Sequence, residues 1–357
     1  MLDKPDIPEG PLAGNVSDAF GLRLERVEFL PLGADLNTAV YRGLGADGAR
    51  YFVKLRFGDF DPMSVALPKY LSERGVGEII APLATRAGKL WADLGAFRVI
   101  VYPFVEGDNA YARPLSDAQW VAFGAALRRI HAVTLPEEIV HRLQVERYDP
   151  QWRARVRASL RRADTETFTD PVASQLATVL RERREAILDL VARTEVLASR
   201  LQTRGRERVL CHADLHAGNL LIGADGGLHI VDWDAPILAP KERDLMYAGG
   251  GQFGNARAPA EEEALFYAGY GQVEIDLDAL AYYRYERIVQ DIAVECDQVL
   301  MTDAGGDDRP QVLRWLLSNF APGGALEIAH RQYESGKRHP RPGVRQTGDA
   351  ASQHAIR

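Results

Sequence analysis

The sequence is poor in cysteine, and it has no cluster of metal-binding cysteines and histidines. Its 357 residues include only two cysteines, Cys211 and Cys296. Two cysteines are too few for a disulfide framework and fit a reducing cytoplasm. The histidines do not join them at the spacing of a zinc site. The sequence therefore excludes a disulfide-rich scaffold, while a chain of this length is able to bury a large hydrophobic core.

Long apolar runs are also missing. No run approaches the ~20 apolar residues of a membrane-spanning helix, and residues 1–10 lack the apolar centre of a signal peptide. We therefore expect no export, no membrane partner and a cytoplasmic location. Residues 335–357 contain prolines and glycines without apolar periodicity, so they are predicted to form a disordered tail.

Over most of the chain, positive charges are outnumbered by negative ones. The net charge is −7, and the segment from Arg331 onward carries an excess of Lys and Arg, so the remainder is more acidic still. An acidic protein does not suggest nucleic acid as a partner, and it favours a cationic small molecule. Plain solubility explains the same charge equally well. Nothing in the sequence indicates an obligate protein partner.

The hydrophobic pattern changes near residue 105. Before it, short alternating runs separated by turns predict a mostly antiparallel sheet, with one helix near residues 62–73. The strands are expected at residues 24–32, 39–42, 50–55, 89–91 and 97–104. After it, helical periodicity dominates. Helices are expected at residues 116–131, 151–162, 171–201, 260–270, 277–301, 310–319 and 325–333. We therefore predict an α+β fold with two lobes, residues 1–105 and 106–334.

Residues 209–234 are the most informative segment. Two short apolar strands are joined at residues 224–227 by a typical hairpin turn. Asn219 lies five residues after Asp214, and Asp232 lies eighteen residues after it. Phosphoryl transfer from a nucleotide needs one carboxylate for the attacking hydroxyl, and an amide oxygen with a second carboxylate for magnesium. We therefore predict that Asp214 is catalytic and that Asn219 and Asp232 bind Mg²⁺.

Each of these residues alone has an ordinary explanation, because Asp and Asn are common in turns. Three of them in register between two apolar strands favour the catalytic interpretation. His212 is better explained as a hydrogen-bonded residue that braces the loop than as an acid or base. The role of His216 stays open.

The motif His212-x-Asp214-x-x-x-x-Asn219, with the later Ile230-Val-Asp-Trp233, resembles the catalytic and metal-binding loops of the aminoglycoside phosphotransferases. That family shares its motif with choline, homoserine and methylthioribose kinases. Residues 102–107, 241–244 and 283–291 are similar to the spectinomycin phosphotransferase branch. The resemblance implies a protein-kinase-like fold, with a small antiparallel sheet lobe containing one helix and a larger, mainly helical lobe. It also implies ATP and Mg²⁺ as cofactors.

The resemblance further implies a nucleotide site in the first lobe. Lys54 would engage the α- and β-phosphates, although an edge-strand lysine gives the same pattern. Gly33 lies in a segment similar to the phosphate-covering loop, and an ordinary hairpin loop is the alternative. Tyr102, Phe104 and the backbone of Val105 would border the adenine, unless the two aromatic rings simply belong to the core.

One departure from the kinase pattern concerns the partner of Lys54. Kinase-like enzymes pair this lysine with a glutamate of the following helix. Residues 62–71 contain no glutamate, and Glu73 comes only at the end of the predicted helix. Either Lys54 has another partner or the helix is misaligned.

The acceptor site is expected on the long helix near the C-terminus. Glu286, Asp291 and Glu295 lie on it, and the last two are four positions apart, where like charges mildly destabilise a helix. A cationic ligand would explain these acidic residues. Salt bridges to Arg284, to Arg287 or to a neighbouring helix would explain them equally well.

Together these features predict an ATP-dependent O-phosphotransferase for a small cationic acceptor, with spectinomycin-type aminocyclitols as the leading substrates. Asp234 would assist the metal or bind acceptor amines, because it points to the same side of an extended strand as Asp232. By resemblance, Asp244 would brace the catalytic loop. One alternative is a kinase of choline or of a sugar. Another is a nucleotide-binding protein without turnover, which would have no need of Asp214.

Overall fold

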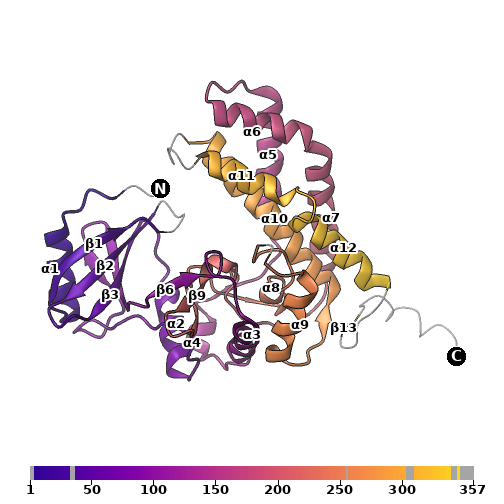
Figure 1. The fold of residues 1–357 in the computed structure, drawn as a ribbon. Helices are drawn as coiled ribbons and strands as arrows, with labels where there is room; N and C mark the ends of the chain where they lie inside the picture. Colours follow the sequence, from indigo (N-terminus) through magenta and orange to yellow (C-terminus); the bar gives the residue numbers. More distant parts are fainter. Residues whose placement is uncertain (1–3, 33–36, 255, 303–308, 339–343, 346–357) are drawn as a thin grey trace. The chain divides into compact units, whose positions relative to one another are not determined.

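The computed structural model describes residues 4–32, 37–254, 256–302, 309–338 and 344–345. Its contacts divide the chain into two parts (Figure 1). The sheet part comprises residues 1–119, 133–143 and 217–236, and the helical part comprises residues 120–132, 144–216 and 237–357. This division interleaves along the chain, and the lobe limits at residues 105 and 334 stay a prediction. Within the described residues, no helix combines the length and apolarity needed to cross a membrane.

The sheet part contains a five-stranded antiparallel sheet in the order β1-β2-β3-β5-β4. Its strands are β1 Leu24–Leu30, β2 Thr38–Gly45, β3 Arg50–Phe57, β4 Ala92–Leu94 and β5 Phe97–Pro103. Four of these match the predicted strands. The prediction of a strand at residues 89–91 was wrong, because Gly88 has a left-handed backbone with φ of 77° and closes a turn between Thr85 and Lys89. The strand therefore begins three residues later.

Helix α1, Glu9–Phe20, was not predicted. It packs on the sheet through Leu12, Val16 and Phe20, which are buried in one cluster with apolar residues of the strands (Figure 1). Their spacing of four residues places them on one face of a helix, so the signal was present in the sequence. The predicted second helix is confirmed as α2, Met63–Glu73.

A smaller sheet carries part of the informative segment. Strand β6, Gly107–Asn109, pairs with β9, Leu220–Gly223, which forms the predicted hairpin with β10, Leu228–Ile230. The short 3₁₀ helix Ala217–Asn219 leads into β9. The sheet part also contains α4, Glu137–Val140. The hairpin therefore has residue 219 at its start and residue 232 at its end.

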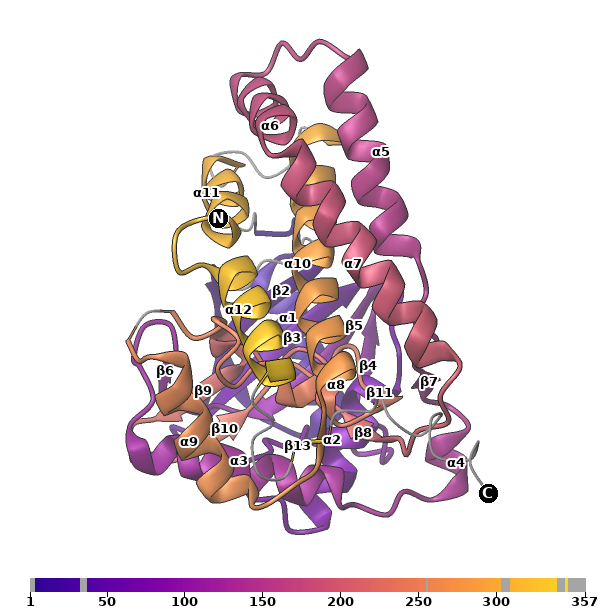
Figure 2. The same ribbon diagram turned by 90° about the vertical axis from the view of Figure 1, so that its right-hand side faces the viewer.

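The helical part is organised around α10, Leu277–Leu300. Its N-terminus is capped by Asp276, whose side chain accepts from the backbone N–H groups of Asp278 and Ala279. Figures 1 and 2 show α5, α7, α11 and α12 packed along it. The helices are α3 Asp117–His131, α5 Gln151–Thr165, α6 Pro171–Glu182, α7 Arg184–Gln202, α8 Glu242–Leu245, α9 Pro259–Tyr270, α11 Arg309–Asn319 and α12 Ala325–Arg338. The strands are β7 Gln144–Val145, β8 Val209–Cys211, β11 Ile237–Ala239, β12 Ile275–Asp276 and β13 Val344–Arg345.

Two helix predictions need correction. The single helix expected at residues 171–201 is two helices, α6 and α7, because the chain leaves helical geometry at Arg183. Residues 335–338, expected in a disordered tail, are helical instead, because α12 continues to Arg338 and its last turn carries basic residues that complement the helix dipole. Residues 344–345 pair with β12. The rest of the predicted tail, residues 339–343 and 346–357, lies outside the described residues.

Glycines allow helices α3 and α9 to approach closely. A Cβ atom added to Gly124 of α3 would collide with the backbone oxygen of Phe266, and one added to Gly269 of α9 would collide with that of Val121. Only glycine fits at these two positions without moving a helix backbone. This contact joins residues 121–125 of α3 to the C-terminal end of α9 in the helical part.

Candidate active site

A lysine and two carboxylates meet in the sheet part. Lys54 lies on β3, the middle strand of the sheet. Its Nζ donates to Oδ1 of Asp232 at 2.8 Å and to the two carboxylate oxygens of Asp234 at 3.1 and 3.0 Å. Glu73 instead pairs with Lys69 at 3.1 Å. Lys54 is therefore paired with these two aspartates in place of the helix glutamate of kinase-like enzymes.

The charges around Lys54 keep it protonated. Its side chain is only 12% exposed. Burial alone would lower its pKa, but the negative charges of Asp232 and Asp234 outweigh this effect and raise the pKa above its ordinary value. Arg56, two residues further along the strand, places Nη1 at 3.2 Å from Oδ2 of Asp234. Two cations thus face two carboxylates, and the cluster is internally neutral.

The backbone is strained beside two predicted site residues. Asp232 has φ of 65° and Ala213, next to Asp214, has φ of 71°. Within the described residues, the only other non-glycine residue with positive φ is Tyr148. A non-glycine residue in this region costs about 1–3 kcal/mol, and such residues concentrate at functional sites. The strain is independent support for function at both ends of the motif.

Asn219 and Asp232 provide suitable ligands for magnesium. The backbone oxygen of Asn219 accepts from the N–H of Val231 at 3.0 Å, so Asn219 lies beside the segment that carries Asp232. The amide and carboxylate oxygens are the hard ligands that Mg²⁺ prefers. The side chain of Asp232 is 46% exposed and so remains accessible to an ion. These two residues fit Mg²⁺, and their assignment as its ligands stays a prediction.

Asp214 belongs to the helical part and has different partners. Its Oδ1 accepts from Nη1 of Arg287 at 2.5 Å and lies 3.5 Å from the Tyr247 hydroxyl oxygen, and its Oδ2 lies 3.6 Å from Nε2 of His216. Burial would raise the pKa of the carboxyl, but Arg287 and His216 lower it below its usual range. Asp214 is therefore ionised at neutral pH, which makes it a weak base and a good hydrogen-bond acceptor.

The loop that precedes Asp214 is held by Asp244. Its carboxylate accepts from the backbone N–H of His212 at 2.9 Å and of Ala213 at 2.7 Å. The third carboxylate contact is Nε2 of His131 at 3.1 Å, and Nδ1 of the same ring lies 2.8 Å from the Tyr270 hydroxyl. These contacts confirm the bracing role expected for Asp244, and through His131 they link α3 and the Tyr270 end of α9 to the loop.

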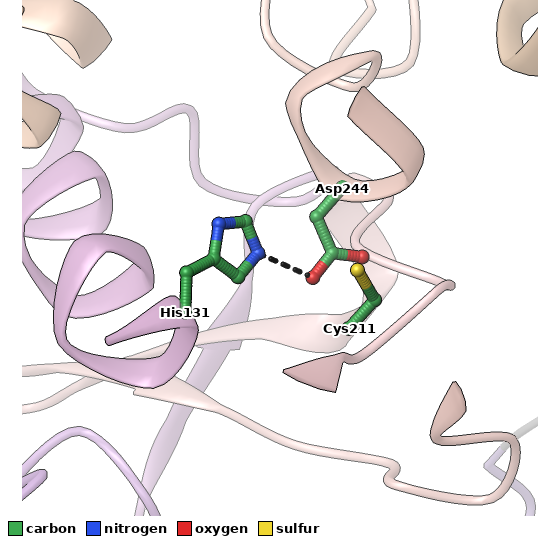
Figure 3. A group of neighbouring side chains, drawn as sticks. All are labelled: His131, Cys211 and Asp244. Carbon is green, nitrogen blue, oxygen red and sulfur yellow. Dashed lines mark hydrogen bonds and ion pairs between the residues drawn. The ribbon is translucent and has the colours of Figure 1, made fainter. Parts of the chain in front are cut away.

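His131, Cys211 and Asp244 lie close enough together to suggest a metal site (Figure 3). Their hydrogen bonds point to another role. Both ring nitrogens of His131 and both oxygens of Asp244 are already engaged. Burial raises the pKa of the Cys211 thiol well above its ordinary value, so it stays protonated and is a poor metal ligand. We interpret the cluster as a structural brace.

Replacing Asp244 by alanine is expected to destabilise the protein by about 2–5 kcal/mol, because two buried backbone N–H groups lose their acceptor. Urea unfolding monitored by circular dichroism measures the change. Asp189, whose side chain is 54% exposed, provides the control, and its replacement should change stability by less than about 0.5 kcal/mol. Equal midpoints for the wild type and Asp244→Ala would contradict the brace.

Glu286 of α10 is paired within the helical part. It is 3% exposed, and its Oε2 accepts from Nη1 of Arg153, a residue of α5, at 2.9 Å. Burial raises its pKa to about 7, with Arg153 acting in the opposite direction. Of the two interpretations of Glu286, the salt bridge to a neighbouring helix describes these contacts. We therefore leave Glu286 out of the acceptor site proposed below.

Glu295 differs from Glu286 although both lie on α10. It is 9% exposed, and its buried Oε2 has no hydrogen-bond partner among the described residues. Burial and the charge of Asp291 raise its pKa to about 9, so its carboxyl is protonated at neutral pH. Asp291 itself lies 2.9 Å from Nε of Arg287. A buried acid without a partner is costly, which makes Glu295 a candidate for ligand binding.

The residues predicted to border the nucleotide have the following environments. Tyr102 and Phe104 both contact Phe52, with ring centroids 6.4 and 6.5 Å apart. Burial raises the pKa of Tyr102 above its ordinary value. Val105 is half-buried, and Gly33 lies outside the described residues. Their role at the adenine and the phosphates stays a prediction.

The predicted residues fall into two groups. The sheet part contains Lys54, Tyr102, Phe104, Val105, Asn219, Asp232 and Asp234, and the helical part contains Asp214, Glu286, Asp291 and Glu295. Within these groups the structure joins Lys54 to two aspartates and joins Asp214 to Asp291 through an arginine. Sequence reasoning missed Arg56 and Tyr247. The position of Arg56 two residues after Lys54 on a strand could have revealed it, whereas only tertiary structure brings Tyr247 to Asp214.

Comparison with known proteins decides the family. The model of the phosphotransferase enzyme family matches residues 28–284, which is more than half of the chain. The chain belongs to the phosphotransferase enzyme family. It is therefore an enzyme, and the motif around Asp214 lies inside the matched region.

Solved structures of spectinomycin phosphotransferase APH(9)-Ia resemble this family member. The complex with ADP and spectinomycin is 34% identical, with a TM-score of 0.85 over 92% of this chain and 98% of that one. The AMP-bound complex is 33% identical, with a TM-score of 0.81 over 91% and 98% of the two chains. Protein StrN of Streptomyces griseus is 28% identical over 232 residues, which is 62% of this chain and 68% of StrN. These likenesses confirm the kinase-like α+β fold.

Proposed function

We propose that this phosphotransferase transfers the γ-phosphate of ATP to a hydroxyl of a small cationic acceptor, an aminocyclitol of the spectinomycin type. The observation that carries the proposal is the state of Asp214. The family motif supplies an ionised carboxylate that is 37% exposed and therefore accessible to a substrate hydroxyl. The 34% identity to a structure that contains ADP and spectinomycin supports the nucleotide and the acceptor class.

The charged cluster of the sheet part is suited to a metal–nucleotide complex. Lys54 and Arg56 are neutralised by Asp232 and Asp234. In the proposal, phosphate oxygens become the partners of the two cations, and Asp232 with Asn219 holds magnesium. Bound magnesium supplies neutralisation of the phosphate charge. The cluster is already neutral before the nucleotide binds. The phosphates then replace the carboxylates beside the two cations, and magnesium replaces the cations beside the carboxylate, so no buried charge is left unpaired.

The remaining nucleotide contacts are assigned by position. In the proposal, Tyr102, Phe104 and the backbone of Val105 border the adenine, and Gly33 belongs to the segment that covers the phosphates. Asp234 is assigned to the nucleotide side, because it pairs with Lys54 and Arg56.

In this proposal Asp214 orients the acceptor. Its carboxylate accepts a hydrogen bond from the acceptor hydroxyl and directs the oxygen at the γ-phosphorus. A bond forms between that oxygen and phosphorus while the bond to the β,γ-bridging oxygen breaks, and ADP leaves with the electron pair. The hydroxyl proton departs through Asp214 to solvent. Because the low pKa of Asp214 makes it a weak base, positioning contributes more than early proton removal, as expected for a loose transition state.

Acidic side chains of α10 are proposed to bind the amine of the acceptor. Glu295 is the main candidate, because its buried carboxyl has no hydrogen-bond partner among the described residues. Asp291 is the second, since its side chain is 22% exposed and it is linked to Asp214 through Arg287. An amino alcohol would place its hydroxyl at Asp214 and its ammonium group at these acids.

An acceptor panel tests the proposal. The purified protein is incubated with Mg²⁺ and ATP plus spectinomycin, a second aminocyclitol, choline or a neutral sugar, and ADP formation and product mass are measured. We expect acceptor-dependent ADP formation with spectinomycin and near-background rates with choline and the neutral sugar. Transfer to choline alone would contradict the proposed acceptor but would still support the assignment as a small-molecule kinase. The absence of acceptor-dependent ADP formation across the panel would contradict the proposed function.

A further inference from the structure

Arg287 of α10 connects two carboxylates in the helical part. Its Nη1 donates to Oδ1 of Asp214 at 2.5 Å and to the Tyr247 hydroxyl at 3.3 Å, and its Nε lies 2.9 Å from Oδ1 of Asp291. The arginine side chain is 17% exposed. Three groups from three segments of the chain thus fix one guanidinium.

This arrangement does more than neutralise charge. A guanidinium is a planar fork whose donors hold a carboxylate in one orientation, whereas an ammonium ion on a flexible stem does not. Nε of Arg287 forms an ion pair with Oδ1 of Asp291, and Asp214 accepts a hydrogen bond from Nη1. Tyr247 also donates to the backbone oxygen of Ala213 at 2.9 Å, so it anchors the strained residue that precedes Asp214. The carboxylate and its backbone are therefore fixed together.

We propose that Arg287, anchored by Asp291 and Tyr247, is a positioning residue that orients the Asp214 carboxylate toward the acceptor hydroxyl. This inference rests on the proposed function of Asp214. Arg287 acts through that carboxylate and does not itself take part in the bond changes.

The arrangement has a consequence for pH dependence. The charged and titratable groups that face Asp214 are Arg287, Tyr247, His216, His212 and Asp291. Burial alone would raise the pKa of Asp214, and Arg287 is the first of the groups that lower it. Without Arg287 the pKa rises, so a larger fraction of Asp214 is protonated at the acid end of the pH range. A protonated carboxyl no longer accepts from the hydroxyl, and kcat then falls with decreasing pH.

The test compares kcat between about pH 5.5 and 9 for the wild type, Arg287→Met and Arg287→Lys. We expect Arg287→Met to lose about 100-fold in kcat at pH 6 and to recover about tenfold at high pH, within the range typical of proton-transfer and orienting groups. Arg287→Lys keeps the charge but loses the fork, so it should lose about tenfold at every pH. Free guanidinium should partly restore Arg287→Met, and the KM for ATP should stay within about threefold.

Arg284, one turn earlier on α10, provides the control. It donates to the backbone oxygens of Met246 and Ala248 and pairs with Glu263, so Arg284→Met should lower the melting temperature without changing the shape of the pH profile. Parallel pH profiles for Arg287→Met and the wild type would overturn the inference. If no acceptor supports turnover by the wild type, the proposed function fails separately. In that case ¹³C NMR titration of labelled aspartate, assigned with Asp214→Asn, decides whether Arg287→Met raises the pKa of Asp214.

Discussion

Asp214→Asn is expected to lower kcat by about a thousandfold or more, while the KM for ATP changes by less than about threefold. Asparagine keeps the shape of the side chain and the hydrogen bond from Arg287 but removes the negative charge that holds the acceptor hydroxyl. General-base and orienting carboxylates contribute about 10²–10⁴-fold, and misplacing the nucleophile adds to that loss. The effect should fall on the chemical step, because the nucleotide contacts assigned above lie in the sheet part.

The measurement is steady-state ADP formation with the best acceptor of the panel, accompanied by calorimetric titration of Mg²⁺–ATP. Lys54→Met serves as the matched contrast, since loss of the phosphate-binding cation should raise the KM for ATP. Asp225→Asn, in the turn of the β9–β10 hairpin, keeps the oxygen that accepts from Gly227 and should behave like the wild type. Unchanged turnover by a folded Asp214→Asn protein would overturn the catalytic assignment.

Glu295→Gln is expected to weaken binding of a cationic acceptor by about 10–100-fold and to stabilise the free protein. A direct ion pair in a poorly solvated site contributes a few kcal/mol, which corresponds to this range of affinity. Glutamine keeps the size of the side chain but provides no charge for the acceptor's ammonium group. The catalytic rate at saturating acceptor should change by less than about threefold, because the transfer step is assigned to Asp214, whose carboxylate is held by Arg287.

The stability effect follows from the direction of the pKa shift. Burial raises the pKa of Glu295 from its ordinary value of 4.5 to about 9. When the pKa of an acid is higher in the folded state than in the unfolded state, its full contribution to stability is present only below the unfolded-state pKa. For Glu295 this contribution is lost as the pH rises from about 4.5 toward 9. Glu295→Gln removes this loss. The free energy of unfolding of the variant should therefore exceed that of the wild type by an amount that grows with pH and reaches about 1–3 kcal/mol at pH 8. Urea denaturation at several pH values measures it.

The same ionisation should appear when the acceptor binds. In the free protein Glu295 is protonated at pH 7, and an ammonium group beside it favours the ionised form, so binding should release about one proton. Calorimetry in buffers of different ionisation enthalpy counts that proton. Affinity should therefore increase as the pH rises toward about 9, for as long as the amine stays charged.

Glu286→Gln separates this behaviour from a general effect of removing an acid from α10. Glu286 is paired with the buried Arg153, so removing its charge should destabilise the protein by about 3–5 kcal/mol without affecting acceptor affinity. The acceptor role of Glu295 is wrong if Glu295→Gln binds the acceptor and releases a proton as the wild type does.

Several elements could be predicted because their signals are local. Alternating apolar positions gave four of the five strands of the main sheet, and the turn residues at 224–227 gave the β9–β10 hairpin. The same local reasoning missed the break at Arg183, where the apolar periodicity continues across the interruption. It also missed α1, although the apolar spacing of that helix was visible.

The acidic residues of α10 show why the acceptor site was harder to predict. In the sequence, Glu286 and Glu295 are both acids on one amphipathic helix. In the structure, Arg153 of α5 neutralises the first, while the second is buried without a hydrogen-bond partner among the described residues. Helical periodicity shows which residues share a face but not which side chains a neighbouring helix contributes. The partner of Lys54 was undecided for a similar reason, since its two aspartates come from the segment after a distant hairpin.

The sequence by itself determined the family motif and the residue types needed for phosphoryl transfer, because Asp214, Asn219 and Asp232 lie within one short segment, whose hairpin lies between Asn219 and Asp232. Only the tertiary structure decided the ionisation states. Arg287, which keeps Asp214 ionised, is 73 residues away in the chain, and burial by the surrounding helices keeps Glu295 protonated. Burial and charge depend on neighbours in space, and local sequence patterns do not identify those neighbours.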